Sequence, residues 1–331
     1  MVIILITNRI IYEAFKFRIK LAKSKIDVFL TSLIFCPFDE EDFAVEIERF
    51  KKRIPFHKTW CKEIILNEII NLKQNLKGET SNNLHFIYER FDLFNYSISL
   101  VKNKQWYIKS IGLFHFQALG YIKAEEYVIP YLNDKNKTLS TNAYIALIAL
   151  TSDKLDFLID YPDSISLTSE IKIMDILHSR KPPMPTNLAE WIHSPNPSIV
   201  KLGVKFMAYY NFTISKEDVL KLFETGTKAI RKEVILAIRN LYIEDAESIL
   251  IQQFGKEQKD NRIEILTTLG EIGSEISLKF LSKLIMETID TDVKLATVYS
   301  INAIDGTFFD NSFTTNEEIM KMTRHVKDPY L

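Results

Sequence analysis

The stretch AIRKEVILAIRNL at residues 229–241 decides the fold that this sequence predicts. Its apolar residues recur at i, i+3, i+4 and i+7, which places them along one side of an α-helix. The same stripe occurs at three successive places in the chain: Val234, Ala237, Ile238 and Leu241; Ile263, Leu266, Leu269 and Ile272; Leu295, Val298 and Ile301. A single pair of such helices cannot bury both of its stripes, so neighbouring pairs are expected to stack on each other.

Seven helix-length segments share this pattern and define a repeat. Each carries an early polar residue, and these anchors lie 29 to 32 residues apart: Lys109, Thr141, Lys172, Lys201, Arg231, Arg262 and Lys294. The second helices of the repeats are predicted at Trp106–Ile122, Leu139–Thr151, Ser169–Ser179, Ser198–Asn211, Ala229–Ile243, Asn261–Ile272 and Asp292–Ile304. The first helices are predicted at Ala124–Leu132, Lys154–Asp160, Asn187–His193, Lys216–Glu224, Ala246–Gly255 and Glu275–Glu287. A period of this length is typical of two-helix repeats.

The repeat resembles that of HEAT proteins, the armadillo-like α-solenoids. The resemblance rests on a Val-Arg-like start and an Ala-Leu-Gly-like end of the second helix. It is carried by Ala229–Ile230–Arg231–Lys232–Glu233 with Ala237–Ile238, by Gln117–Ala118–Leu119–Gly120, and by Arg262 with Leu269–Gly270–Glu271–Ile272–Gly273. It covers about residues 105–304 and is loose around Leu155–Pro185, where prolines interrupt helices. It implies an all-α fold: a right-handed α-solenoid of about seven HEAT-like helix pairs, with a helical N-terminal region and a C-terminal capping helix.

The chain also resembles a group of bacterial membrane-anchored HEAT-repeat proteins. The segments that match are Lys104–Gln105–Trp106–Tyr107–Ile108–Lys109 and the end of the chain, Glu318–Ile319 through His325–Val326–Lys327–Asp328. The chain departs from that group at its start, where most of the anchor is absent. The resemblance implies a location at the cytoplasmic face of the inner membrane and a link to cell-surface polysaccharide synthesis.

The beginning of the chain is basic and aromatic. Met1 to Ile6 is apolar but far shorter than the roughly 20 residues that a spanning helix needs. Basic residues then alternate with apolar ones: Arg9, Lys16, Arg18, Lys20, Lys23 and Lys25. This pattern is typical of a membrane-proximal helix that faces anionic lipids. The alternative is a helix that packs its apolar side on the domain and keeps its lysines in solvent.

Four regions follow from these patterns: residues 1–25 as the basic apolar helix at the membrane, 26–104 as a helical N-terminal cap, 105–304 as the repeats, and 305–331 as a C-terminal cap. Within the N-terminal cap, Asp39–Asp42 predicts an acidic helix start. Lys58–Leu76 is predicted as a helix, Gly78–Asn83 as a polar loop and Leu84–Asn103 as further helix. Thr314–Asp328 is predicted as the closing helix.

Composition and motifs weigh against catalysis. The 331 residues are 47% hydrophobic, with 9 glycines and 10 prolines, which favours helices over sheet folds with many tight turns. No phosphate-binding loop, nucleophile elbow or HExxH string occurs in the sequence. Cys36 and Cys61 lack the spacing of metal ligands, and so do the scattered histidines. We therefore expect no enzyme activity, no metal and no cofactor, with reduced cysteines and a half-buried His115.

One basic residue recurs per repeat, at Lys109, Lys201, Arg231, Arg262 and Lys294. These residues form either a basic ladder for an acidic partner on a concave face, or a structural ladder in which each side chain bonds a nearby turn. Recurrence at the repeat period favours the structural interpretation. The net charge of −1 weighs against a nucleic-acid partner, which would need a basic stripe.

The sequence therefore predicts a non-catalytic scaffold that binds a protein partner, whose identity it does not give. The residues expected on the binding surface are Lys205, Tyr209, Arg239 and Tyr242, since they project from successive second helices. Trp106, which opens the first repeat, is expected in the core. The alternative functions are nucleic-acid binding, as in DNA-repair-like HEAT proteins, and an enzyme whose residues converge only in space.

Overall fold

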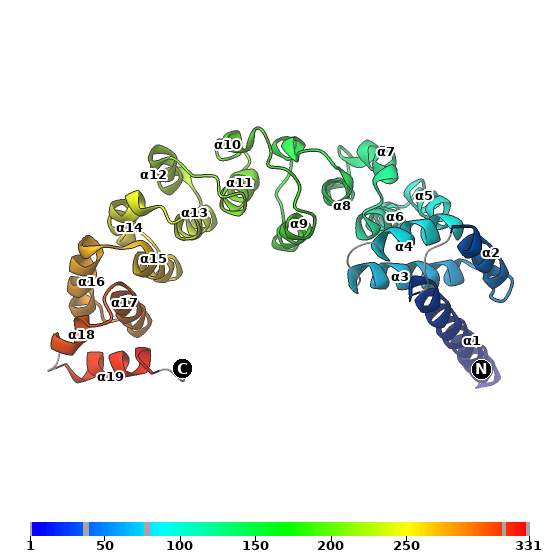
Figure 1. Cartoon of the computed structure of the whole chain (residues 1–331), viewed down its shortest axis with the longest axis horizontal. Helices are drawn as coiled ribbons and strands as arrows, with labels where there is room; N and C mark the ends of the chain where they lie inside the picture. The colour runs from blue at the N-terminus through cyan, green and yellow to red at the C-terminus, as the bar shows by residue number, and fades with distance from the viewer. Residues whose placement is uncertain (1, 36–39, 76–79, 313–315, 329–331) are drawn as a thin grey trace. The chain divides into compact units, whose positions relative to one another are not determined.

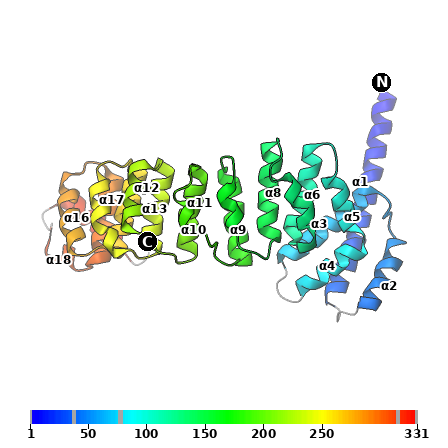
Figure 2. The ribbon, with the colours of Figure 1, turned by 90° about the horizontal axis from the view of Figure 1, so that it is seen from above.

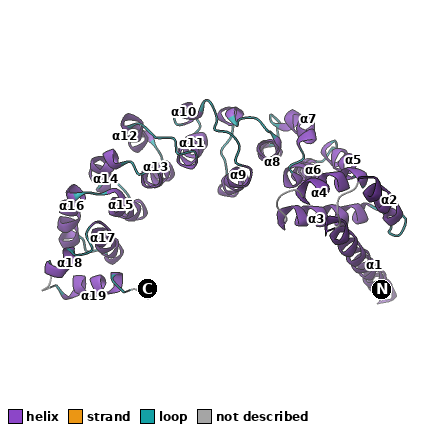
Figure 3. Ribbon diagram, viewed as in Figure 1, coloured by secondary structure: helices purple, strands orange, loops and turns teal. Residues whose placement is uncertain are grey.

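The computed structural model describes residues 2–35, 40–75, 80–312 and 316–328. Throughout these ranges the chain consists of helices and the loops that join them, and no strand occurs in them (Figure 3). The prediction of an all-α protein is confirmed. The chain forms two compact units, one of residues 1–153 with 167–182, and one of residues 154–166 with 183–331.

The first unit begins with a long helix that packs on a small helical bundle (Figure 1). Helix α1 contacts α3 and α4, α6 contacts α3, α5 and α8, and α8 contacts α9. The helices of this unit are α1 (Val2–Phe35), α2 (Glu40–Lys51), α3 (Thr59–Asn75), α4 (Thr80–Arg90), α5 (Leu93–Val101), α6 (Trp106–Leu119), α7 (Glu125–Val128), α8 (Lys137–Leu150) and α9 (Leu167–Arg180). The predicted boundary at residue 25 thus falls inside a continuous helix.

The second unit is a succession of short helix pairs. Second helices α11, α13, α15 and α17 each pack against the next, and α19 packs against α17. Its α-helices are α10 (Leu188–Trp191), α11 (Pro197–Tyr209), α12 (Lys216–Thr225), α13 (Lys228–Asn240), α14 (Glu247–Phe254), α15 (Lys259–Ile272), α16 (Glu275–Glu287), α17 (Thr291–Ile304), α18 (Phe308–Asn311) and α19 (Glu317–Val326). The first helices α10, α12, α14 and α16 each pack on the second helix that follows them.

All seven predicted second helices are present, with ends within three residues of the predicted ones. The helix predicted at Ala124–Leu132 is instead broken into α7 and two 3₁₀ turns, Ile122–Ala124 and Ile129–Tyr131. The one predicted at Lys154–Asp160 is a 3₁₀ helix, Asp156–Asp160. The polar loop predicted at Gly78–Asn83 was wrong from Thr80 onward, where α4 begins; Gly78 and Glu79 lie outside the described residues.

Apolar stripes and buried hydroxyls join the second helices of the second unit. Leu266 of α15 and Val298 of α17 are completely buried, as the stacking of stripes requires. The Thr268 hydroxyl lies 3.5 Å from the carbonyl oxygen of Ile235, and the Ser300 hydroxyl donates to that of Leu266 at 2.6 Å. These contacts lie between α13 and α15 and between α15 and α17, at positions 33 and 34 residues apart, and each hydroxyl also lies 2.8 Å from a carbonyl oxygen of its own helix.

Candidate functional site

Helix α1 changes character along its length. From Ala22 onward one side is buried against α3 and α4, through Ala22, Ile26, Leu30 and Leu33. Between Arg9 and Leu21, every side chain that the structure describes is exposed except Ile19, which is half-buried. Figure 2 shows this half of α1 extending beyond the other helices of its unit. Apart from Phe15, the apolar side chains described in the first half of α1 are thus left largely uncovered by the rest of the described chain.

An exposed apolar stripe runs along α1. Ile10, Phe17, Leu21 and Val28 are between 49% and 70% exposed. Their positions are i, i+7, i+11 and i+18, which at 100° per residue fall within about 40° of one another around the helix axis. The buried residues Ala22, Ile26 and Leu30 fall on nearly the opposite side. We call Ile10, Phe17, Leu21 and Val28 the α1 stripe.

Cations flank the α1 stripe on both sides. Arg9, Lys16 and Lys20 share one flank with the single carboxylate Glu13, and Arg18 and Lys25 share the other flank. The structure gives these five cations no ion pair within the described part of the chain. Lys23 differs from them: its Nζ lies 3.0 Å from Glu68 Oε1 on α3, and the hydrogen bond to this carboxylate raises the pKa of the lysine. Of the predicted membrane-proximal residues, Lys23 is thus engaged within the fold.

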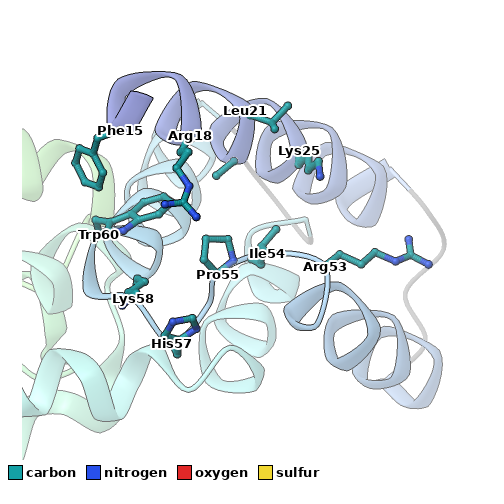
Figure 4. A pocket seen from close by; sticks show the side chains of 11 residues that line it. Phe15, Arg18, Leu21, Lys25, Arg53, Ile54, Pro55, His57, Lys58 and Trp60 are labelled. Carbon is teal, nitrogen blue, oxygen red and sulfur yellow. The ribbon is translucent and has the colours of Figure 1, made fainter. Parts of the chain in front are cut away.

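A pocket of about 390 Å³ lies at the base of this half of α1. One wall is α1 itself, and the other is the turn between α2 and α3 with the first residues of α3 (Figure 4). Its lining residues are Phe15, Arg18, Leu21, Ala22, Lys25, Arg53, Ile54, Pro55, His57, Lys58 and Trp60. No Asp or Glu is among them. The pocket, which we call the α1 pocket, joins cations to an apolar and aromatic surface.

Two aromatic rings close one end of the α1 pocket. Phe15 of α1 packs edge-on against Trp60 of α3, with ring centroids 5.9 Å apart and an interplanar angle of 80°. In Figure 4, Arg18 is directed from α1 towards Trp60 and Pro55, while the guanidinium of Arg53 lies at the end away from Trp60. Sequence reasoning selected Arg18 and Lys25 but missed Trp60 and Arg53, because a residue separation of more than 25 hides their proximity to α1.

Each residue of the predicted basic ladder contacts a group in its own unit. Lys109 lies over the Tyr131 ring, 4.6 Å from its centroid. The other four, all in the second unit, have polar partners: Lys201 with Glu233 at 3.9 Å, Arg231 with Glu257 and the Gly226 carbonyl, Arg262 with the carbonyls of Phe254 and Gly255, and Lys294 with Glu318 at 2.7 Å. Asn196 and Asp290, in the turns before α11 and α17, cap those helices.

Ion pairs between successive second helices of the second unit follow one direction along the chain. A cation on one second helix reaches a carboxylate on the next: Lys205 to Glu233 at 3.2 Å, Lys228 to Asp260 at 2.7 Å, Lys232 to Glu264 at 3.3 Å, Arg239 to Glu264 at 3.4 Å, and Lys259 to Asp290 and Asp292 at 2.9 and 2.6 Å. The pairs that are exposed on both sides, such as Lys228–Asp260 and Lys259–Asp292, contribute little energy individually. The pairs nevertheless neutralise basic side chains that would otherwise attract the phosphate backbone of a nucleic acid.

The four residues predicted to bind a partner therefore differ in availability. Lys205 and Arg239 are both engaged by carboxylates of the following helix. Tyr209 packs edge-on against Tyr210, with ring centroids 4.8 Å apart. Tyr242 is 58% exposed and occupies the left-handed region with φ of 54°, at the point where α13 ends. A non-glycine residue in this region is strained, which makes Tyr242 the most unusual member of the set.

His115 and Cys61 are both buried. His115 is only 5% exposed, lies 3.2 Å from the Ser97 hydroxyl, and has its pKa lowered to about 4 by burial. Cys61 is a free thiol in the core, and burial raises its pKa to about 11; Cys36 lies outside the described residues. Trp106 was wrongly expected in the core, since 44% of it is exposed. No group of three His, Cys, Asp or Glu residues positioned to hold a metal occurs in the described ranges.

No family model matches the chain. No curated protein matches it.

Among the described residues, no helix is both long enough and apolar enough to pass through a bilayer.

Proposed function

We propose that this chain is a HEAT-type α-solenoid adaptor that lies at an anionic membrane surface through the first half of α1 and binds a protein partner through its stacked helices. The observation that carries this proposal is the α1 stripe: exposed, apolar and bordered by cations without ion pairs. The cytoplasmic face of a bacterial inner membrane, and a link to cell-surface polysaccharide synthesis, belong to the same proposal through the family resemblance.

The chemistry of α1 suits a membrane interface. An interfacial helix buries an apolar face among the lipid headgroups while basic residues at its borders contact lipid phosphates. Each Lys or Arg near an anionic surface contributes about 1 kcal/mol. Five such residues, Arg9, Lys16, Arg18, Lys20 and Lys25, border the stripe. Apolar burial and charge attraction together are the two signals that stable peripheral binding needs.

A second copy of α1 fits the stripe less well. The positions Ile10, Ala14, Phe17 and Leu21 alternate at spacings of four and three, which would also suit a helix pair. In such a pair, however, the lysines and arginines that border the stripe would face those of the second copy and repel them. Anionic lipid supplies the opposite charge.

The scaffold part of the proposal is supported by the repeated contacts of the second unit. The packing of α11 on α13, α13 on α15 and α15 on α17, at a near-constant period, is what a solenoid built from helix pairs would give. The pairing of Lys205, Lys228, Lys232 and Arg239 with carboxylates weighs against the nucleic-acid alternative, because paired cations release few counterions.

Vesicle co-sedimentation tests the membrane part. We expect the chain to bind vesicles that contain phosphatidylglycerol, to bind phosphatidylcholine vesicles far less, and to dissociate as salt is raised. The triple variant Lys16→Gln/Phe17→Ser/Lys20→Gln should lose this binding. A matched control exists on α16: Ile276→Ser/Lys279→Gln/Lys283→Gln removes two exposed lysines and one exposed apolar residue elsewhere. Equal binding by the two variants, or a dimer that the α1 variant dissociates, would contradict the proposal.

A gel-retardation series with double-stranded DNA tests the nucleic-acid alternative. The proposal predicts no shift at physiological salt. A shift that weakens steeply with salt would favour the alternative function.

A further inference from the structure

We infer that the α1 pocket binds the headgroup of one anionic phospholipid, taken from the surface on which α1 lies. This inference rests on the proposed function and makes it more specific. Without such a site, α1 would contact lipid only through its outer face. With the site, one lipid headgroup is held at a defined place beside α1.

The charged side chains of the pocket lining favour an anionic ligand. Arg18 and Lys25 on α1 and Arg53 and Lys58 on the opposite wall all line the pocket, and no carboxylate lines it. The structure records no ion pair for these four side chains among the residues that it describes. Cations that line a cavity with no carboxylate in its wall favour an anion that enters it, and Arg18 is directed into this cavity whereas the Arg53 guanidinium lies at its outer end (Figure 4). Arginine in particular suits phosphate, since its planar donors bind two oxygens at once.

The apolar wall gives the second argument. Phe15, Leu21, Pro55 and Trp60 contribute apolar surface next to these cations. Inorganic phosphate would leave that surface in contact with water. A ligand that carries both an anionic group and a hydrocarbon part covers both surfaces. The pocket is therefore complementary to an anionic amphiphile, and tryptophan is a residue that favours the boundary between headgroups and chains.

Position gives the third argument, which selects a membrane lipid over a soluble phosphate ester. Leu21 belongs both to the α1 stripe and to the pocket lining, so the cavity opens beside the face that would contact a bilayer. A headgroup can enter it with the first carbons of the acyl chains against the apolar wall, while the rest of the chains remain among other lipids. The volume of about 390 Å³ fits this division, because it is within the range of small-molecule sites and too small for the whole lipid.

Trp60 supplies a reporter for the experiment. Of the three tryptophans, Trp191 is fully buried in the other unit and Trp106 is partly exposed. In a Trp106→Phe background, a change in emission on adding ligand reports Trp60. Dihexanoyl phosphatidylglycerol below its micelle concentration is the probe, dihexanoyl phosphatidylcholine tests the need for negative charge, and glycerol phosphate tests the need for chains.

We expect a saturable change in Trp60 emission with dihexanoyl phosphatidylglycerol, and at least about tenfold weaker binding of the other two probes. Arg18→Gln/Arg53→Gln should weaken binding of the first probe by at least about tenfold. Lys16→Gln/Lys20→Gln is the matched control, because it removes two cations of α1 that do not line the pocket, and it should bind the probe normally. Circular dichroism confirms that both variants are folded.

Three results would overturn the inference: no saturable change, equal binding of glycerol phosphate or of the choline lipid, or unchanged binding by Arg18→Gln/Arg53→Gln. Because the probe is monomeric, the result does not depend on vesicle binding. Failure of the chain to bind vesicles, with intact binding of the monomeric lipid, would reject the membrane proposal and leave the site established as an amphiphile site. Vesicle binding without probe binding would reject the site alone.

Discussion

Replacing Arg231 separates a structural ladder from a partner-binding one. The Arg231 guanidinium donates through Nε and Nη2 to the Glu257 carboxylate and through Nη1 to the Gly226 carbonyl at 2.7 Å. The Glu257 side chain is only 2% exposed. In Arg231→Met the aliphatic stem is kept but the charge is lost, so Glu257 is left as a buried carboxylate that still accepts a hydrogen bond from the Asn261 amide at 2.8 Å.

The magnitude follows from that burial. Removing one member of a buried ion pair costs roughly 3–5 kcal/mol, because the other charge stays desolvated without a partner. We expect Arg231→Met to lower the free energy of unfolding of the second unit by about 3 kcal/mol. The double variant Arg231→Met/Glu257→Gln should recover most of this loss, since a neutral amide accepts the Asn261 bond without a buried charge.

Urea denaturation at pH 7 measures the effect. Circular dichroism follows the helices, and the emission of the buried Trp191 identifies the transition of the second unit. The double-mutant cycle then gives the coupling between the two residues. A loss below about 1 kcal/mol for Arg231→Met, or a double variant as unstable as the single one, would refute the structural interpretation of the ladder.

Three further predictions concern single positions. A Cβ on Gly203 would lie 2.8 Å from the Cβ of Trp191, so Gly203→Ala should destabilise by about 1–3 kcal/mol in urea, whereas Gly255→Ala meets no atom within 4 Å and should not. Burial lowers the pKa of His115 to about 4, so as the pH falls the unfolded chain takes up a proton at this residue before the folded chain does. The free energy of unfolding should therefore decrease as the pH falls from about 6.5 to about 4. Between pH 7 and pH 4.5 the free energy of unfolding should fall by about 2 kcal/mol less in His115→Phe than in the unsubstituted chain. An equal fall in both would show that His115 is not neutral in the fold. Tyr242→Gly should raise the unfolding free energy by about 1 kcal/mol, because φ of 54° costs glycine nothing; a lower value would show that the ring's contacts outweigh the backbone strain.

Local periodicity was enough to locate the second helices but not the contacts between them. The stripes of Val234–Leu241 and Ile263–Ile272 predict helices because one buried face dictates the spacing. Which carboxylate Lys228 or Lys232 reaches depends on how α15 lies against α13, with partners 32 residues away in each case. The sequence therefore predicts that ladder residues bond nearby turns, as Arg231 and Arg262 do through the carbonyls of Gly226, Phe254 and Gly255, but it does not predict which carboxylate a cation reaches on the next helix.

The candidate site was predictable only in part, for a similar reason. The basic residues of α1 are visible as a local pattern, and Arg18 and Lys25 were selected from it. The second wall of the pocket, from Arg53 to Trp60, joins them only because α1 packs on α3. The helix start at Thr80 was missed because a polar first turn has the composition of a loop.

Amide hydrogen exchange of the full chain, with and without phosphatidylglycerol vesicles, tests the central claim most directly. Without lipid, the amides of α1 before Ala22 should exchange quickly, because no buried face supports that half of the helix. With vesicles, we predict strong protection of residues 9–21, weaker protection of the turn at residues 53–60, and no change in α11 to α17. Unchanged exchange in α1, or protection confined to the second unit, would contradict the account.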